Sequence, residues 1–233
     1  MIQYFSGTIP GVDGERPIAV LRDDTHLSRW IENSRRLDAD DPVLLARIMD
    51  LIPPGSVVVD AGASLGDHAA LYSTKAKIVH AFEPQPESFL CLAWNAAGRE
   101  NVWPRMLGLS DREGLVSFAR NPNVGAGRIG PGEMWIQTVQ LDRLELDPGL
   151  IKLDVEGHEI PALRGARETI LRSRPVLVVE VNKWQMDPAG FSIRDLWMEL
   201  DGLGYHHCKD IRTGAPFDPA DGKPEYDIVG TPC

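Results

Sequence analysis

The chain has 233 residues, 43% of them hydrophobic, which suffices for one folded domain with a sizeable core. Its 24 basic and 34 acidic residues give a net charge of −10, which argues against nucleic acid as a partner. No apolar run approaches the roughly 20 residues that span a bilayer, and the first residues lack a signal-peptide pattern. We therefore expect a soluble cytoplasmic protein without a membrane partner.

The first part of the chain is predicted to be irregular and then helical. Residues 1–25 are rich in Gly, Pro and Asp, which indicates short strands or loops. Helices are predicted over 26–37 and 42–51. The second helix has apolar residues at helical spacing, and Asp41 before Pro42 is a favourable start for it.

Strands and helices then alternate, which indicates parallel strands joined by right-handed crossovers. The first predicted strands are 56–60, 77–82 and 102–107, and the helices between them are 66–74 and 86–98.

Residues 108–149 interrupt this alternation. A flexible, glycine-rich loop is predicted at 123–132, between short strands at 115–118 and 135–139. The alternation resumes with a strand at 150–154, a helical segment to about residue 172, a strand at 176–180, a helix at 192–203, and strands near 204–208 and 226–229.

Two of the predicted strands end in an acidic residue. The strand that begins at Val57 delivers Asp60 into the turn Ala61-Gly62-Ala63-Ser64-Leu65-Gly66, and the next strand ends in Glu83-Pro84. Ligands of open α/β sheets bind at the carboxyl ends of the strands, so both acids are expected at one binding edge. The turn backbone would hold the polar tail of a nucleoside cofactor, and Glu83 would accept hydrogen bonds from its ribose.

The glycine turn also indicates which nucleoside cofactor it holds. Dinucleotide-binding turns usually read G-x-G-x-x-G, and the middle glycine is missing here. A carboxylate at Asp60 would repel a pyrophosphate but suits the ammonium group of an amino-acid tail. The pattern therefore favours S-adenosylmethionine over NAD. An NAD-dependent oxidoreductase and a non-catalytic nucleotide-binding subunit remain as alternatives.

Several further motifs follow in a fixed order: Ala81-Phe82-Glu83-Pro84-Gln85-Pro86, Leu92-Ala93-Trp94-Asn95, Leu109-Ser110-Asp111, Val139-Gln140-Leu141-Asp142-Arg143-Leu144, Ile151-Lys152-Leu153-Asp154-Val155-Glu156-Gly157-His158-Glu159, Leu163-Arg164-Gly165-Ala166 and Val178-Val179-Glu180. With the turn after Asp60, they resemble the FkbM family of S-adenosylmethionine-dependent methyltransferases over roughly residues 43–183. The segment from Lys152 to Glu159 is the most distinctive.

The resemblance implies a fold, an activity and a set of ligands. The fold is α/β, a seven-stranded, mostly parallel, Rossmann-like class I methyltransferase sheet with helices on both faces and one antiparallel strand near its edge. The activity is O-methylation of a small hydroxylated acceptor, a sugar or natural product, with S-adenosylhomocysteine as the second product. Residues 1–53 would form part of the acceptor side and 54–233 the cofactor-binding domain, together one compact unit.

The resemblance also assigns cofactor-binding residues. Asp60, Gly62, Ala63 and Gly66 would hold the methionine end, Glu83 the ribose, and Ser110 with Asp111 would flank the adenine. The same cofactor site would include Ser64, His68, Pro84 and Asp154, although an aromatic residue often stands where this chain has His68.

A hydroxyl acceptor needs a base to take its proton, and the candidates follow the fourth and fifth core strands. His158 has the pKa best matched to neutral pH, and a partly desolvated Glu156 is nearly as suitable. We expect one of these two to be the base, with Asp154 and Glu180 orienting the acceptor. Lys152 lies in a buried strand and is predicted to pair with a carboxylate.

Two other roles for these side chains stay open. Asp154, Glu156, His158 and Glu180 could bind Mg²⁺ or Mn²⁺, which would acidify the acceptor hydroxyl. Nothing in the sequence requires a divalent metal, so no metal ligand is assigned. Acidic residues at this position also cap helices, which is the structural alternative. The sequence predicts neither the identity of the acceptor nor an oligomeric state.

Overall fold

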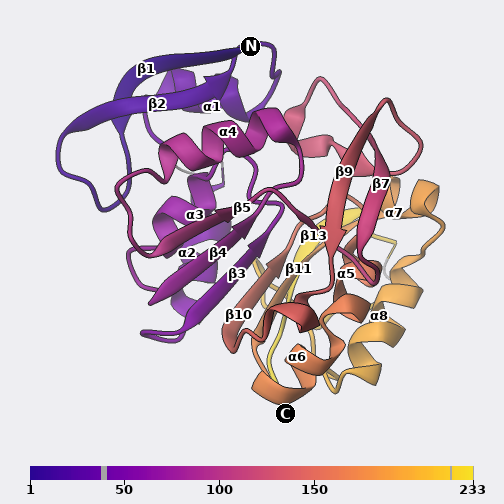
Figure 1. The fold of residues 1–233 in the computed structure, drawn as a ribbon. Helices are drawn as coiled ribbons and strands as arrows, with labels where there is room; N and C mark the ends of the chain where they lie inside the picture. The colour runs from indigo at the N-terminus through magenta and orange to yellow at the C-terminus, as the bar shows by residue number, and fades with distance from the viewer. Residues whose placement is uncertain (38–40, 221, 233) are drawn as a thin grey trace.

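A seven-stranded sheet runs through the centre of the protein (Figure 1). The computed structural model describes residues 1–37, 41–220 and 222–232. The strand order is β12-β13-β11-β10-β3-β4-β5. The strands are β3 (Val57–Ala61), β4 (Ile78–Phe82), β5 (Val102–Arg105), β10 (Pro148–Leu153), β11 (Val176–Asn182), β12 (Lys209–Asp210) and β13 (Glu225–Gly230).

Strand direction confirms the fold class expected from the sequence. Strands β3, β4, β5, β10 and β11 are mutually parallel. Strand β13 runs antiparallel to both of its neighbours, β11 and β12. The sheet is therefore mostly parallel, with one antiparallel strand next to its edge strand.

Helices cover both faces of the sheet, because successive strand residues point to opposite sides. Val58 packs with α2 (Pro42–Leu51), α3 (Asp67–Tyr72) and α4 (Pro86–Asn95). Its neighbour Val59 packs with α5 (Glu159–Gly165), α6 (Arg167–Ser173) and α8 (Ile193–Gly202). Each such side chain stabilises the fold by about 1.5–3 kcal/mol when fully buried. Two hydrophobic layers thus hold the strand ends in place.

The N-terminal segment packs against the helix layer of the main sheet. Strands β1 (Ile2–Thr8) and β2 (Glu15–Leu21) form an antiparallel hairpin, followed by α1 (Leu27–Ser34). Asn95 fixes the hairpin to the core: its side chain accepts from Ala19 N and donates to Ala19 O and Leu65 O, at 2.8–2.9 Å. The hairpin is therefore bonded through one amide to the turn that follows β3.

The interruption between β5 and β10 is a small second sheet. Its strands are β6 (Gly108–Leu109), β7 (Gly114–Ala119), β8 (Arg128–Ile129) and β9 (Met134–Val139), in the order β6-β9-β7-β8. The 3₁₀ turns η1 (Val124–Ala126) and η2 (Leu141–Leu144) lie beside it. The two short strands predicted here are confirmed as β7 and β9; β6 and β8 were not predicted.

The prediction of a strand near 204–208 was wrong. Gly204 has φ +85 and ends the turn that follows α8, and the buried Tyr205 donates from its hydroxyl to Pro175 O at 2.6 Å. The chain therefore folds into the core here, and the edge strand follows as β12. Helix α7 (Lys183–Ala189) was not predicted either.

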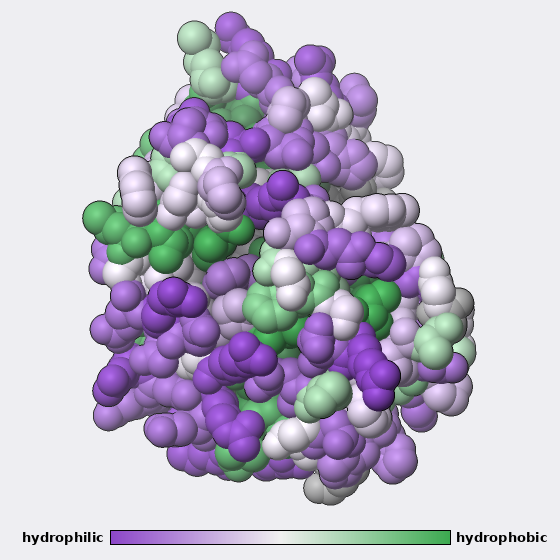
Figure 2. Space-filling view, turned by 90° about the vertical axis from the view of Figure 1, so that its right-hand side faces the viewer, coloured by the Kyte–Doolittle hydropathy of each residue, from purple (hydrophilic) through white to green (hydrophobic). Residues whose placement is uncertain are grey.

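The single helical segment expected after residue 158 is two helices, α5 and α6. The face of the molecule shown in Figure 2 is mostly hydrophilic, with separate hydrophobic patches. None of the described helices has both the length and the apolar character needed to cross a bilayer.

Candidate active site

A cavity of about 310 Å³ lies where the parallel strands end. The turn after β3, the end of β4, the segment after β10 and the end of β11 form its floor, which is the position at which open α/β sheets bind ligands. The N-terminal segment, the loop between β7 and β8, and the C-terminal part of the chain form its walls. These walls include His26, Leu27, Asp41, Leu44, Phe118, Asn123, Val124, Gly125, Gly127, Ile129, Arg212, Glu225 and Asp227.

The turn after β3 is held tightly against the neighbouring strands. Gly62 and Ala63 donate from their backbone N–H groups to Phe82 O, both at 3.0 Å. Gly62 has φ +82, and a Cβ there would stand 1.8 Å from Asp154 O. Ser64 also has a positive φ of 46. Only a glycine at residue 62 permits this approach, so the turn and the end of β10 are fixed relative to each other.

Glu83 joins the turn to the end of β4. Its carboxylate accepts from Ser64 N at 3.0 Å and from Gln85 N at 2.8 Å. Burial raises the pKa of Glu83 to about 7, against the effect of these two hydrogen bonds. Glu83 and Pro84 both line the cavity, as do Gly62, Ala63 and Ser64. The carboxylate is thus positioned to accept hydrogen bonds from a ligand in the cavity.

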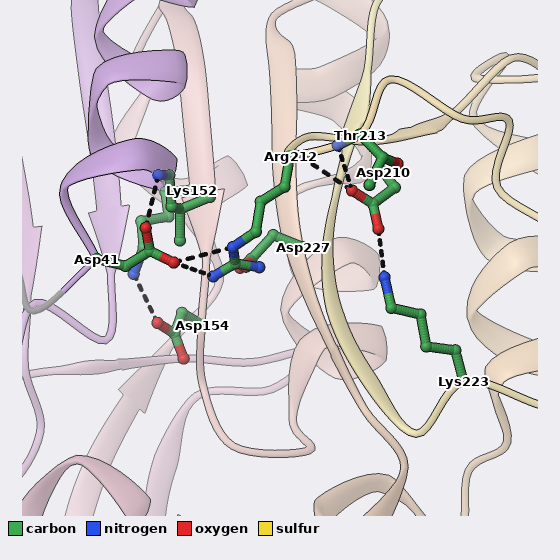
Figure 3. A network of polar contacts seen from close by, with 9 residues as sticks. Asp41, Lys152, Asp154, Asp210, Arg212, Thr213, Lys223 and Asp227 are labelled. Atoms are coloured by element: carbon green, nitrogen blue, oxygen red, sulfur yellow. Dashed lines mark hydrogen bonds and ion pairs between the residues drawn. The ribbon is translucent and has the colours of Figure 1, made fainter.

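Asp60 lies deeper than the sequence suggested. It is fully buried, does not line the cavity, and neither of its oxygens has a hydrogen-bond partner within the described ranges. Lys152 Nζ is 3.9 Å from Asp60 Oδ1 and 2.8 Å from Asp154 Oδ2. The predicted pairing of Lys152 with a carboxylate is confirmed (Figure 3). Burial raises the pKa of Asp60 to about 6.

Three acidic side chains converge on one point of the cavity floor. Oxygens of Asp154, Glu156 and Glu180 lie within 4.8 Å of one another, and all three residues line the cavity. Burial first, and the charge of Asp154 second, raise the pKa of Glu156 to about 8 and that of Glu180 well above its usual range. Burial also acts on Asp154, but the ammonium of Lys152 lowers its pKa. One carboxylate is therefore held charged, beside two that retain protons near neutral pH.

His158 points away from these acids. A turn in which Glu156 has φ 55 and Gly157 has φ 90 separates His158 from Asp154 along the chain. His158 Nε2 lies 3.0 Å from Ser110 Oγ, and burial lowers its pKa to about 4, so the imidazole is neutral. His158, Ser110 and Asp111 do not line the cavity. The structure therefore does not bring these three candidates to the acidic cluster.

His68 lies in the cavity wall as a neutral imidazole. Its Nδ1 is 3.3 Å from the hydroxyl of Tyr72, and its Nε2 is 3.8 Å from Asp67 Oδ2. Burial lowers its pKa to about 3. Gly66 provides the backbone start of α3, which presents His68 to the cavity.

One part of the wall was not predicted from the sequence. Arg212 donates to Asp41 through Nε at 2.9 Å and Nη2 at 2.7 Å, and to Asp227 through Nη1 at 2.7 Å (Figure 3). This fork connects the start of α2 with β13. The pairing of β13 with β11 also places Asp227 opposite Glu180 and Glu225 opposite Asn182. The alternation Glu225-Tyr226-Asp227 was the one available sign that both acids share a face.

The strand order and the position of this cavity define a Rossmann-like α/β fold with a ligand site at the ends of its parallel strands. A TehB-like SAM-dependent methyltransferase from Corynebacterium glutamicum is similar in structure, with a TM-score of 0.53 and 14% identity, over 88% of this chain and 94% of that one. The FkbM methyltransferase from Methylobacillus flagellatus has a TM-score of 0.51 and 18% identity, over 78% of this chain and 48% of that one. At these identities the likeness shows the shared fold.

Sequence comparison then gives the family. Residues 60–207 match the Methyltransferase FkbM domain, and the chain belongs to this methyltransferase family, as its motifs indicated. The hexuronic acid methyltransferase AglP of Haloferax volcanii is 36% identical over 135 residues. That match covers 54% of this chain and 56% of AglP, so it spans little more than half the length of the relative.

Proposed function

We propose that the protein is an S-adenosylmethionine-dependent O-methyltransferase acting on a hydroxyl of a small, sugar-like acceptor. The observation that carries the proposal is a single cavity that joins the glycine turn and Glu83 to the acids Asp154, Glu156 and Glu180. Family membership supports methyl transfer, and the name of AglP supports an acceptor of the sugar type.

The residues present fit the cofactor. Gly62, Ala63 and Ser64, which line the cavity, would form the wall beside its amino-acid tail, and Glu83 would accept hydrogen bonds from its ribose hydroxyls. Asp60 would act from beneath the turn, as a buried charge rather than through direct contact. S-adenosylmethionine, when bound, supplies a methyl group on a positively charged sulfur. The protein would accelerate the reaction by holding the cofactor and the acceptor in a reactive geometry, because this removes much of the entropic barrier.

Glu156 is the proposed base. It lines the cavity, and its pKa of about 8 makes its carboxylate form a strong base that becomes available as the pH rises towards 8. Asp154, held charged by Lys152, and Glu180 would orient the acceptor hydroxyl towards it. His158 is better suited to holding the segment around Ser110, through the contact between their side chains.

Calorimetric titration with S-adenosylhomocysteine and with NADH tests the class of cofactor. We expect S-adenosylhomocysteine to bind and NADH not to bind. The opposite result would favour an oxidoreductase. Methyl transfer from labelled S-adenosylmethionine to a panel of sugars is the second measurement. Glu156→Gln is expected to keep the affinity for S-adenosylhomocysteine and to lose roughly 10²–10⁴-fold in turnover. Cofactor binding without turnover of any hydroxylated acceptor would indicate a non-catalytic subunit.

A further inference from the structure

The three acids on the cavity floor form a ligand set of a particular geometry. One oxygen each from Asp154, Glu156 and Glu180 lies within 4.8 Å of the other two. Oxygens that surround a single cation at 2.0–2.6 Å are separated by roughly 3–5 Å, so this spacing suits one shared ion. The three residues come from two adjacent strand ends, β10 and β11, which are held parallel by their backbone pairing.

Buried oxygens in this set lack protein partners. Glu156 Oε2 and Glu180 Oε2 are both buried, and neither has a hydrogen-bond partner in the described part of the chain. Asn182 Oδ1, two residues further along the same strand, is buried and unpartnered in the same sense. Buried polar oxygens are almost always paired in native proteins, so their partner is expected to be something that binds.

Among the described residues, neither Lys152 nor Arg212 donates a hydrogen bond to Glu156 or Glu180. Lys152 Nζ donates to Asp154 Oδ2, and its other close carboxylate is Asp60. Arg212 is engaged by Asp41 and Asp227. Glu156 Oε2 and Glu180 Oε2 are therefore not paired with a cationic side chain of the described residues, although both residues line an accessible cavity.

We propose that Asp154, Glu156 and Glu180 bind one divalent cation of the Mg²⁺, Mn²⁺ or Ca²⁺ type. Three hard oxygen ligands without a sulfur or imidazole favour these ions over Zn²⁺. His158, which the sequence offered as a fourth ligand, is outside the set because it contacts Ser110.

Such an ion has a specific use in the proposed reaction, and this use rests on the proposed function. An acceptor hydroxyl bound to the cation becomes more acidic, as metal-bound water does. Its proton would pass to the oxygen of Glu156 that does not bind the metal. The acceptor oxygen would then form the new bond to the methyl carbon while the bond from that carbon to sulfur breaks.

Binding of Mn²⁺ to the chelator-stripped, full-length protein tests the site directly. Free Mn²⁺ gives an electron paramagnetic resonance signal that disappears on binding. We expect one ion per chain with a Kd below about 1 mM. Glu180→Gln should weaken binding on the order of a hundredfold. Glu156→Gln is the second variant, in case the first does not fold by circular dichroism.

Glu225→Gln is the matched control. Glu225 lines the same cavity but is not one of the three ligands, so its removal should change the affinity by about fivefold at most. Equal losses of Mn²⁺ affinity in the Glu225 and Glu180 variants would mean that the ion is attracted only by the overall negative charge of the cavity, which would overturn the site. The absence of stoichiometric Mn²⁺ binding would overturn it as well. S-adenosylhomocysteine is titrated into the same samples. If it binds and Mn²⁺ does not, the metal site fails and the proposed function stands.

Discussion

At the scale of single residues, the site depends on how its buried carboxylates are compensated. Lys152 holds Asp154 charged and lies within ion-pair range of Asp60, and both Lys152 and Asp60 are buried. A buried charge that loses its partner is costly, because the remaining group can no longer be solvated. Lys152 is therefore expected to matter for stability as much as for function.

Lys152→Met is expected to lower the free energy of unfolding by about 3 kcal/mol, because it leaves two carboxylates without their cation. Urea denaturation followed by circular dichroism measures this. Lys183→Met is the control, because Lys183 pairs with Asp187 at the surface, where both side chains are half exposed. That change should cost less than about 1 kcal/mol. Similar losses of unfolding free energy in the two variants would show that the buried ion pair stabilises the fold no more than the exposed pair does.

Glu83→Gln is expected to weaken S-adenosylhomocysteine binding roughly thirtyfold, or about 2 kcal/mol. An amide cannot accept from both Ser64 N and Gln85 N through two oxygens, so the turn loses one of its supports. Glu87→Gln, on the surface of α4, serves as the comparison, because Glu87 pairs with the exposed Arg120. Unchanged calorimetric affinity in the Glu83 variant would remove this residue from the site.

At the scale of elements, two features bring the strand ends together. One is a close backbone contact between the turn after β3 and the end of β10, and the other is the register in which β13 pairs with β11. The turn after β3 meets the end of β10 through Gly62, and β13 brings Asp227 opposite Glu180. The first depends on the absence of a side chain and the second on antiparallel pairing between distant segments.

Gly62→Ala tests the first of these contacts. The new methyl group would meet Asp154 O at 1.8 Å, so backbone must move, and we expect a loss of more than about 3 kcal/mol together with S-adenosylhomocysteine binding. Gly55→Ala is matched in backbone conformation, with φ +67, but has open space around its Cβ. It should cost only about 1–2 kcal/mol. Thermal unfolding and calorimetry distinguish the two, and equal effects would mean that only φ matters.

The sequence predicted the elements that have local signals and missed the contacts between distant segments. Local signals were sufficient for β3, β4, β10 and β11, because buried strands alternate with amphipathic helices and end in acids. They were also sufficient for the turn and Glu83. The fork of Arg212 joins residues 171 positions apart, which no local pattern encodes. The contact of His158 with Ser110 likewise joins residues 48 positions apart, which no local pattern encodes.

At the scale of the whole molecule, the buried acids make stability depend on pH. Burial raises the pKa of Glu83 and Glu159 to about 7 and that of Glu156 to about 8. Between pH 6.5 and 8 these carboxyls are already ionised in the unfolded chain but retain protons in the folded one. The folded state then binds more protons, so its stability falls as the pH rises. Buried histidines such as His158, whose pKa is lowered to about 4, act oppositely, but only below about pH 6.5.

The free energy of unfolding should therefore drop by about 3 kcal/mol from pH 6.5 to pH 8, in chelator and without cofactor. Urea titrations at the two pH values measure the change. Glu156→Gln removes one of the titrating groups and should make the drop smaller. A stability that increases over this interval would contradict the proton retention described for these acids.

Asn95 has a consequence for protein engineering. Its amide bonds the β2 strand on one side and the backbone of Leu65 on the other. Chimeras that exchange the first hairpin between relatives, with the aim of changing acceptor choice, would also disturb the turn after β3, which is proposed to contact the methyl donor. A graft made at the boundary before α2 therefore has to carry a compatible α4 with it.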